Sequence, residues 1–146
     1  MTEYYGVNLD YSGARFKKDA AVLFMNLFYL TDVYGQDAYR TYCEDGKLDP
    51  ADDESKEEFV DSYENETFCS TGLEQLIADY INDHVFSHET VFRYEDCVLG
   101  VEPTIPDDEE DKKRLPTKKQ IQEVLAEYLN PLLEEPLHIG WYGIYE

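Results

Sequence analysis

The stretch ARFKKDAAVLFMNLFYLTDVY, residues 14–34, is the part of the sequence around which we expect the fold to be organised. Apolar side chains recur there at spacings of three and four, the pattern of one helix face: Phe16, Ala20, Leu23, Leu27, Leu30 and Tyr34. After Asp19 the other faces are apolar too, and such a helix is buried. Asn26 and the flanking charges make the run too short to span a bilayer. The stretch therefore predicts a buried core helix that ends at Gly35.

Length and composition predict one compact domain, residues 1–146. The chain has 146 residues, of which 42% are hydrophobic and 14% aromatic, so it can build a core. The N-terminus has neither the basic start nor the apolar run of a signal peptide. The three cysteines, Cys43, Cys69 and Cys97, lack metal-type pairing, and we expect reduced thiols in a cytoplasmic protein.

Three segments have the pattern of strands: residues 3–11, 89–101 and 137–145. Between them, apolar faces predict a helix with Pro50 in its first turn and further helices after Thr71 and after Thr117, with a short helical turn at 36–47. Thr71 with Glu74, and Thr117 with Gln120, match a capping box, and Pro131 should end or kink the last helix. This order predicts an α+β fold in which helices pack against a three-stranded sheet that we expect to be antiparallel.

The net charge of −21 lies entirely in the middle of the chain. Residues 32–111 contain 25 acidic and 4 basic side chains, whereas the remaining residues contain 8 of each. A surface of this kind repels nucleic acid and anionic membranes and attracts basic proteins. We therefore expect no direct binding of nucleic acid, no membrane association, and a basic, nucleic-acid-binding protein as the partner.

The acidic residues form two clusters that we take as the candidate partner-binding site. The first cluster is Glu44, Asp45, Asp49, Asp52, Asp53, Glu54, Glu57, Glu58, Asp61 and Glu64. The second is Asp107, Asp108, Glu109, Glu110 and Asp111, followed at once by three basic residues. On a helix, the row Asp53, Glu57, Asp61 and Glu64 would place carboxylates about 5–6 Å apart. Such a row resembles the regular charge of a phosphate backbone, and we expect it to contribute more affinity than the second cluster.

Large aromatic side chains alternate with these acids, which is typical of interface anchors. They are Tyr34, Tyr39, Tyr42, Phe59, Tyr63 and Phe68. In size, charge and the stretches LDPADDESKEEFVDSYENE (48–66) and PDDEEDKK (106–113), the chain resembles the small acidic DNA-mimic inhibitors of phages and mobile elements, the antirestriction and anti-CRISPR proteins. That resemblance implies a non-enzymatic inhibitor that blocks the nucleic-acid channel of a CRISPR effector, a restriction enzyme or a similar protein.

Other interpretations remain open at the level of sequence. The acids could form a merely solvated surface, or an adaptor or immunity-type module that binds one basic partner without mimicking nucleic acid. A small enzyme or metal-binding domain is the third class, but the chain has no GxSxG, P-loop or CxxC, and we expect no cofactor. His84 and His88 are the only two-ligand metal pair, which predicts no structural metal. The Tyr-rich ends, Tyr4-Tyr5 and Trp141-Tyr142, would suit a homodimer seam if they were exposed.

Overall fold

A computed structural model describes residues 2–9, 15–63, 72–95, 97–102 and 116–144. It contains a four-stranded antiparallel sheet with the order β2-β3-β1-β4, so β2 and β4 lie at its edges. The strands are β1 (Thr2–Asn8), β2 (Arg93–Glu95), β3 (Val98–Val101) and β4 (Gly140–Ile144). The fold class α+β is confirmed, and the expected strand count of three is wrong.

The extra strand arises because the segment 89–101 is a hairpin rather than one strand. Glu95 pairs with Val98, so the chain reverses over two residues. Cys97, in the second of these positions, has a φ of 67°, the left-handed conformation that tight hairpin turns require. No Asn-Gly or Asp-Gly pair marks this turn in the sequence, which is why the alternating pattern alone indicated a single strand.

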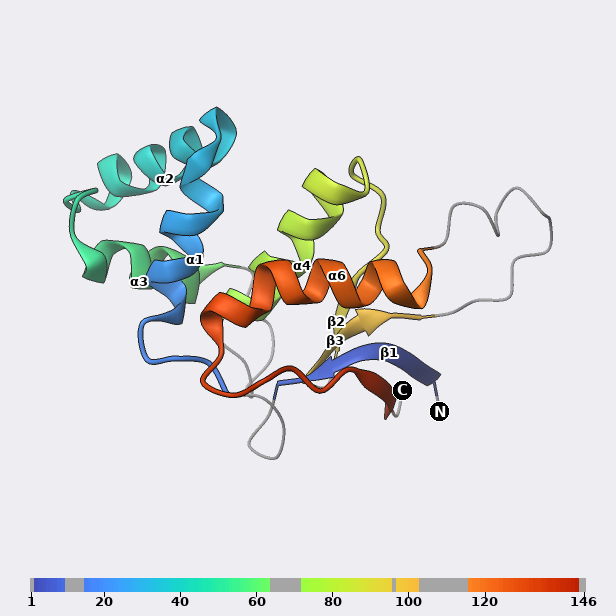
Figure 1. The fold of residues 1–146 in the computed structure, drawn as a ribbon. Helices are drawn as coiled ribbons and strands as arrows, with labels where there is room; N and C mark the ends of the chain where they lie inside the picture. The colour runs from blue at the N-terminus through green and yellow to red at the C-terminus, as the bar shows by residue number, and fades with distance from the viewer. Residues whose placement is uncertain (1, 10–14, 64–71, 96, 103–115, 145–146) are drawn as a thin grey trace.

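The helices are α1 (Ala20–Leu27), α2 (Val33–Gly46), α3 (Asp53–Ser62), α4 (Gly72–Val85) and α6 (Lys118–Leu129). Short 3-10 turns, η1 (Tyr29–Thr31) and η2 (Asn130–Leu132), follow α1 and α6. In Figure 1, α1, α2 and α3 gather at one end of the molecule, and α6 runs from this end over the sheet strands. None of the described helices is long and apolar enough to cross a membrane.

The predicted core helix is interrupted after Leu27. The Tyr80 hydroxyl donates to the carbonyl of Phe28 at 3.1 Å, and Asp32 then caps α2 by accepting from the backbone N–H of Gly35 at 2.7 Å. Gly35 thus lies in the first turn of α2, where a Cβ would meet the Tyr29 carbonyl oxygen at 1.9 Å. The expectation that Gly35 ends a helix, and that 36–47 adds only a short turn, is wrong.

The buried face of α1 also differs from the expected one. Val22, Phe24 and Met25 are buried, whereas Leu27 is 47% exposed and Tyr34 is 78% exposed. Phe16 lies before the first residue of α1, and Tyr34 lies beyond the break, in α2, so neither belongs to the buried face of α1. The stretch still supplies the core, where Phe24 and Phe28 pack against Tyr80.

The sheet buries side chains on both faces. Tyr5, Val7, Leu99 and Val101 belong to the main core under the helices, whereas Tyr4 and Val98 form a second small cluster. On the helix side, Gln122 of α6 donates to the Tyr5 hydroxyl at 2.8 Å. A row of three glycines crosses the sheet, with Gly6 of β1 opposite Gly100 of β3 and Gly140 of β4.

The last helix is as predicted. Thr117 and Gln120 form a full capping box at the start of α6, and α6 ends just before Pro131, which lies in η2. The second predicted box cannot be compared, since Thr71 lies outside the described residues, but α4 begins at Gly72 with Glu74 in its first turn. Pro50 precedes α3 instead of occupying its first turn, because Asp52 is the N-cap.

Candidate functional site: an acidic surface and a polar cavity

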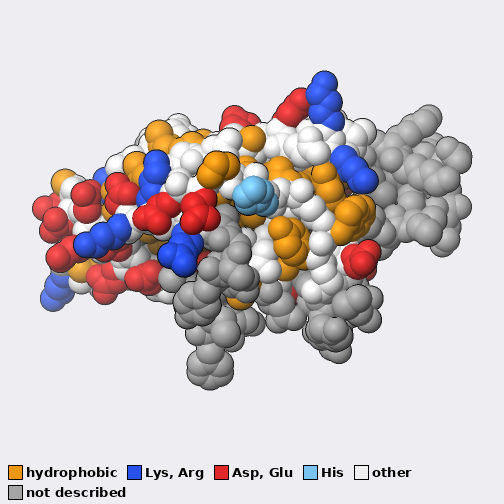
Figure 2. All heavy atoms as spheres, turned by 60° about the horizontal axis from the view of Figure 1, so that its bottom comes forward, with side chains coloured by type: hydrophobic (Ala, Val, Ile, Leu, Met, Phe, Trp, Pro, Cys, Tyr) orange, Lys and Arg blue, Asp and Glu red, His pale blue; other side chains and the backbone are white. Residues whose placement is uncertain are grey.

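The acids of the first predicted cluster lie at the end of the molecule formed by α2 and α3. Nine of them fall in the described ranges and all nine are exposed: Glu44, Asp45, Asp49, Asp52, Asp53, Glu54, Glu57, Glu58 and Asp61. Figure 2 shows acidic side chains crowded at this end, with basic side chains among them. Six predicted acids lie outside the described residues: Glu64, Asp107, Asp108, Glu109, Glu110 and Asp111.

Helix ends hold this acidic surface in place. Lys47, with a φ of 55°, ends α2 in the left-handed conformation, and the N–H of Leu48 donates to the Cys43 carbonyl at 2.8 Å. The Tyr39 hydroxyl donates to the Pro50 carbonyl at 3.0 Å and ties α2 to the turn before α3. Asp53 and Glu54 occupy the first turn of α3, where the helix dipole favours negative charge. The carboxylates are therefore displayed on a preformed backbone.

The aromatic residues between the acids are core, not interface anchors. Tyr39 and Phe59 are buried, and their ring centroids lie 5.5 Å apart. Tyr42 packs on Phe59 at 5.2 Å, and these contacts join α2 to α3. Among the aromatics we proposed as anchors, Tyr34 alone is exposed within the described chain, and Phe68 lies outside it. The aromatic pattern therefore gives no support to an interface.

The acids of α3 form two columns with different surroundings. At 100° per residue, both columns lie on the face away from Phe59: Asp53, Glu57 and Asp61 toward the Val60 side (the inner column), and Glu54 and Glu58 toward the Ser55 side (the outer column). Lys56 contacts the inner column, with its Nζ 3.9 Å from Asp53 Oδ1 and 2.9 Å from Asn26 Oδ1.

Basic residues from the N-terminal part also reach the inner column. Glu57 and Asp61 share a surface depression with Lys17 and Lys18. Sequence counting assigned these lysines to a neutral end, but the fold brings them beside α3. Within the described ranges, no basic side chain forms an ion pair with Glu54 or Glu58. The outer column therefore presents the less compensated charge.

The two histidines that could have shared a metal have separate partners. His84 Nε2 lies 2.6 Å from Asp32 Oδ2, and His88 Nδ1 lies 3.1 Å from Asp83 Oδ1. Burial would raise the pKa of Asp32, but hydrogen bonds from the Gly35 N–H and from His84 outweigh it and lower this pKa below its usual value. In the part of the chain that the structure describes, no three His, Cys, Asp or Glu side chains lie together as metal ligands would.

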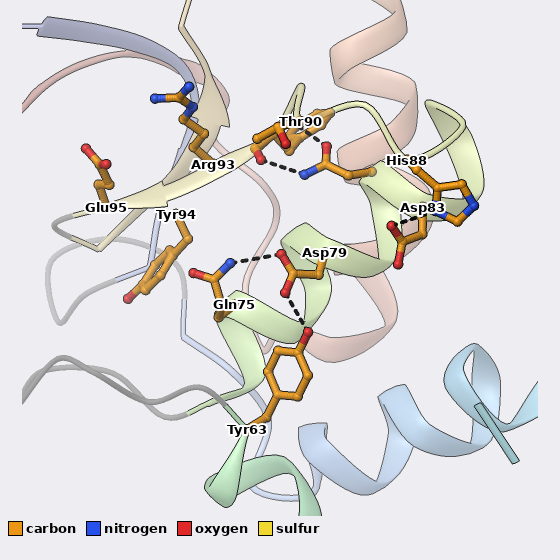
Figure 3. Close-up of a pocket in the computed structure, with 11 residues that line it drawn as sticks. Tyr63, Gln75, Asp79, Asp83, His88, Thr90, Arg93, Tyr94 and Glu95 are labelled. Carbon is orange, nitrogen blue, oxygen red and sulfur yellow. Dashed lines mark hydrogen bonds and ion pairs between the residues drawn. The ribbon is translucent and has the colours of Figure 1, made fainter. Parts of the chain in front are cut away.

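A polar cavity of about 490 Å³ lies between α4 and the segment that leads into β2 (Figure 3). Gln75, Asp79 and Asp83, spaced four residues apart, contribute one face of α4 to it. Asp79 Oδ2 accepts from the Tyr63 hydroxyl at 2.5 Å, and Asp79 Oδ1 accepts from Gln75 Nε2 at 3.0 Å. Tyr94 points into the space beside Gln75 (Figure 3).

The opposite wall of the cavity is fixed by the buried side chain of Asn82. Its Oδ1 accepts from the N–H groups of Val91 and Phe92 at 3.0 and 2.7 Å, and its Nδ2 donates to the Phe92 carbonyl at 2.8 Å. The turn before this wall has Ser87 and His88 at positive φ, 52° and 71°. Sequence reasoning missed this site, although the spacing of Gln75, Asp79 and Asp83 on α4 was a readable signal.

Comparisons of the chain with protein-family models, with curated proteins and with solved structures found no match. The geometry and charge of the described side chains therefore carry the functional proposal.

Proposed function

We propose that this protein is a non-enzymatic acidic inhibitor whose α2–α3 end occupies the basic channel of a nucleic-acid-binding protein, in place of nucleic acid. The observation that carries the proposal is the exposure of nine carboxylates on two helix-supported segments at one end of the molecule. Residues 32–63 contain eleven acidic and three basic side chains, a net charge of −8.

Two physical arguments support this use of the surface. The carboxylates of α3 belong to a formed helix, so little ordering entropy is lost when a partner binds. Negative charge concentrated at one end also steers that end toward a basic channel and raises the association rate. We expect the outer column to contribute more than the inner one, because Lys56, Lys17 and Lys18 offset part of the inner charge.

The proposal is tested by competition with nucleic acid. The immobilised protein is incubated with a nuclease-treated lysate of its natural host, and bound proteins are eluted with duplex DNA or tRNA of unrelated sequence. We expect nucleic-acid-binding proteins to be released at an ionic strength at which salt alone does not release them. A direct gel shift of labelled DNA by the purified protein at physiological salt would contradict the proposal.

Matched variants locate the contact. Glu54→Gln/Glu58→Gln and Glu57→Gln/Asp61→Asn each remove two exposed charges from α3. The first pair should weaken retention more than the second. Partners that resist elution by nucleic acid but are lost with the variants would instead identify an adaptor or immunity-type module that binds one basic protein.

A further inference from the structure

The cavity between α4 and β2 contains a fixed carboxylate without a cationic partner. Asp79 is half-buried and held by two neutral donors, the Tyr63 hydroxyl and the Gln75 amide. Across the described residues, no Lys, Arg or His forms an ion pair with Asp79. Arg93 also lines the cavity, but it projects from the side of β2 opposite to Tyr94 (Figure 3), and its ion-pair partner is Glu102 at 4.0 Å.

The hydrogen bonds that Asp79 already accepts favour a guanidinium over an ammonium group as its ligand. Each of its two oxygens already accepts one hydrogen bond, and a carboxylate has about four acceptor positions, so each oxygen retains one. Two remaining positions on a fixed, planar carboxylate match the paired N–H groups of a guanidinium, whereas an ammonium donates as a point charge.

The walls of the cavity suit the same group. Tyr63 and Tyr94 line it, and guanidinium planes stack on aromatic rings. Asp83 lies one helical turn from Asp79, and like charges at this spacing destabilise a helix. Asp83 already contacts His88, so a cation at Asp79 would offset the one of the two charges that has no such contact. The volume of about 490 Å³ is in the range of small-ligand sites, and it accommodates more than the guanidinium itself.

We infer that this cavity binds a guanidinium group, held by Asp79 in a two-pronged contact and stacked against Tyr94. The inference stands independently of nucleic-acid mimicry, because it rests on residues of α4 and β2 and not on the acidic surface of α2 and α3. The group can come from an arginine side chain of a protein or from a free guanidino compound.

Calorimetric titration with defined probes tests the inference and separates the two sources. The probes are the peptide acetyl-Gly-Arg-Gly-amide, its lysine and citrulline counterparts, and agmatine. We expect saturable one-to-one binding of the arginine peptide, and binding of the citrulline peptide weaker by about tenfold or more, because citrulline has the same shape without the charge. Tighter binding of the peptide than of agmatine assigns the site to a protein chain, and the reverse assigns it to a free compound.

Variants locate the binding. Asp79→Asn keeps the size of the side chain and should weaken arginine-peptide binding about tenfold or more. Asp45→Asn, which removes an equivalent charge from the exposed end of α2, is the matched control and should leave it unchanged. Tyr94→Leu provides a second readout should Asp79→Asn fail to fold.

Three results would overturn the inference. The first is an absence of saturable binding to the parent protein. The second is equal binding of the lysine and arginine peptides. The third is an equal loss of affinity in Asp45→Asn and Asp79→Asn, which would indicate attraction by overall charge.

Discussion

The α2–α3 end and the four-stranded sheet are held together by different means. In the α2–α3 end, each helix satisfies its own backbone, and a few aromatic contacts such as Tyr39–Phe59 join the two helices. In the sheet, backbone groups are satisfied across strands, and Gly6 and Gly100 approach so closely that no side chain fits between them. The difference shows where a chain can display a large charge. Helices satisfy their own backbone hydrogen bonds, so their solvent-exposed faces can hold many acidic side chains that make no packing contacts.

The largest effect should come from adding one carbon to the sheet. A Cβ on Gly6 would lie 2.1 Å from the Leu99 carbonyl oxygen and 2.5 Å from the Gly100 Cα, both of them backbone atoms. Gly6→Ala should therefore lower the free energy of unfolding by about 3 kcal/mol or more, as measured by urea denaturation. Gly140→Ala is the control, because a Cβ there meets nothing within 4 Å, and its cost should stay within about 0.5 kcal/mol. Similar costs for both variants would show that the close approach does not constrain the sheet.

High pH should destabilise the core that joins the two regions. Burial raises the pKa of Tyr29 to about 12, and it also raises the pKa values of Tyr80 and Tyr128. An unfolded tyrosine ionises near pH 10, so the unfolded chain loses protons that the folded chain retains. The contribution of these tyrosines to stability should be constant below about pH 10 and should fall as pH rises from there to about 12.

Tyrosinate absorbance and circular dichroism, recorded together, measure this alkaline transition. Tyr29→Phe removes the Tyr29 contribution and should flatten the decline while it keeps most of the packing. Ionisation of Tyr29 near pH 10 without loss of ellipticity, measured as the absorbance difference between the parent and Tyr29→Phe, would contradict the burial argument.

The α2 cap should have an intermediate effect. Asp32 accepts from the Gly35 N–H, and Asp32→Ala should cost about 1 kcal/mol. The lowered pKa of Asp32 means that its contribution is present above the unfolded value near 3.9 and is lost as pH falls through the lower folded value. Asp32→Asn retains a capping side chain, so its stability profile between about pH 2 and 5 should be flatter than that of the parent. Identical profiles would show that the cap carries no pH dependence.

The smallest expected change in stability comes from neutralising acids of α3, and it should differ between the inner and outer columns. Glu54→Gln/Glu58→Gln relieves a like-charge pair and should raise stability by about 0.2–0.5 kcal/mol in thermal unfolding at low salt. Glu57→Gln should give no gain, because Lys17 and Lys18 border it. High salt should abolish the difference. An equal gain from both changes would mean that the lysines do not influence the inner column.

The sequence predicted what depends on local patterns. The capping pair Thr117 and Gln120 predicted the start of α6, and the alternation of apolar residues predicted β1 and β4. The density of acidic residues predicted that α3 is exposed. It did not predict the break after Leu27, where the Phe28 carbonyl accepts from the Thr31 N–H at 3.1 Å and also from the Tyr80 hydroxyl, 52 residues away. Asp32 is the N-cap of α2 and accepts from the N–H of Gly35. The sequence contained this capping residue, but it lies within an apolar run that indicated one continuous helix.

In the candidate site, too, the features that depend on local sequence were predictable and those that depend on distant contacts were not. The exposure of the α3 acids was predictable from spacing, since Phe59 and Val60 had to face inward. The position of Lys17 and Lys18 beside these acids was not predictable, because it results from the fold, which brings the segment before α1 next to α3. The Asp79 cavity also required the fold, since Asn82 positions its far wall through the backbone of Val91 and Phe92.

The place of β4 at the edge of the sheet has a consequence for the behaviour of the protein in concentrated solution. An edge strand exposes unpaired N–H and C=O groups, on which further strands can assemble, and proteins commonly block such edges with lysine or proline. The β4 sequence GWYGI contains neither, nor any other charge. Copies that each carry a charge of −21 repel one another before their edges meet, over a screening length of about 8 Å at physiological salt. The acidic charge of the whole chain thus keeps the sheet edges of different copies apart, and molar salt should turn a stable solution into one that forms β-rich aggregates.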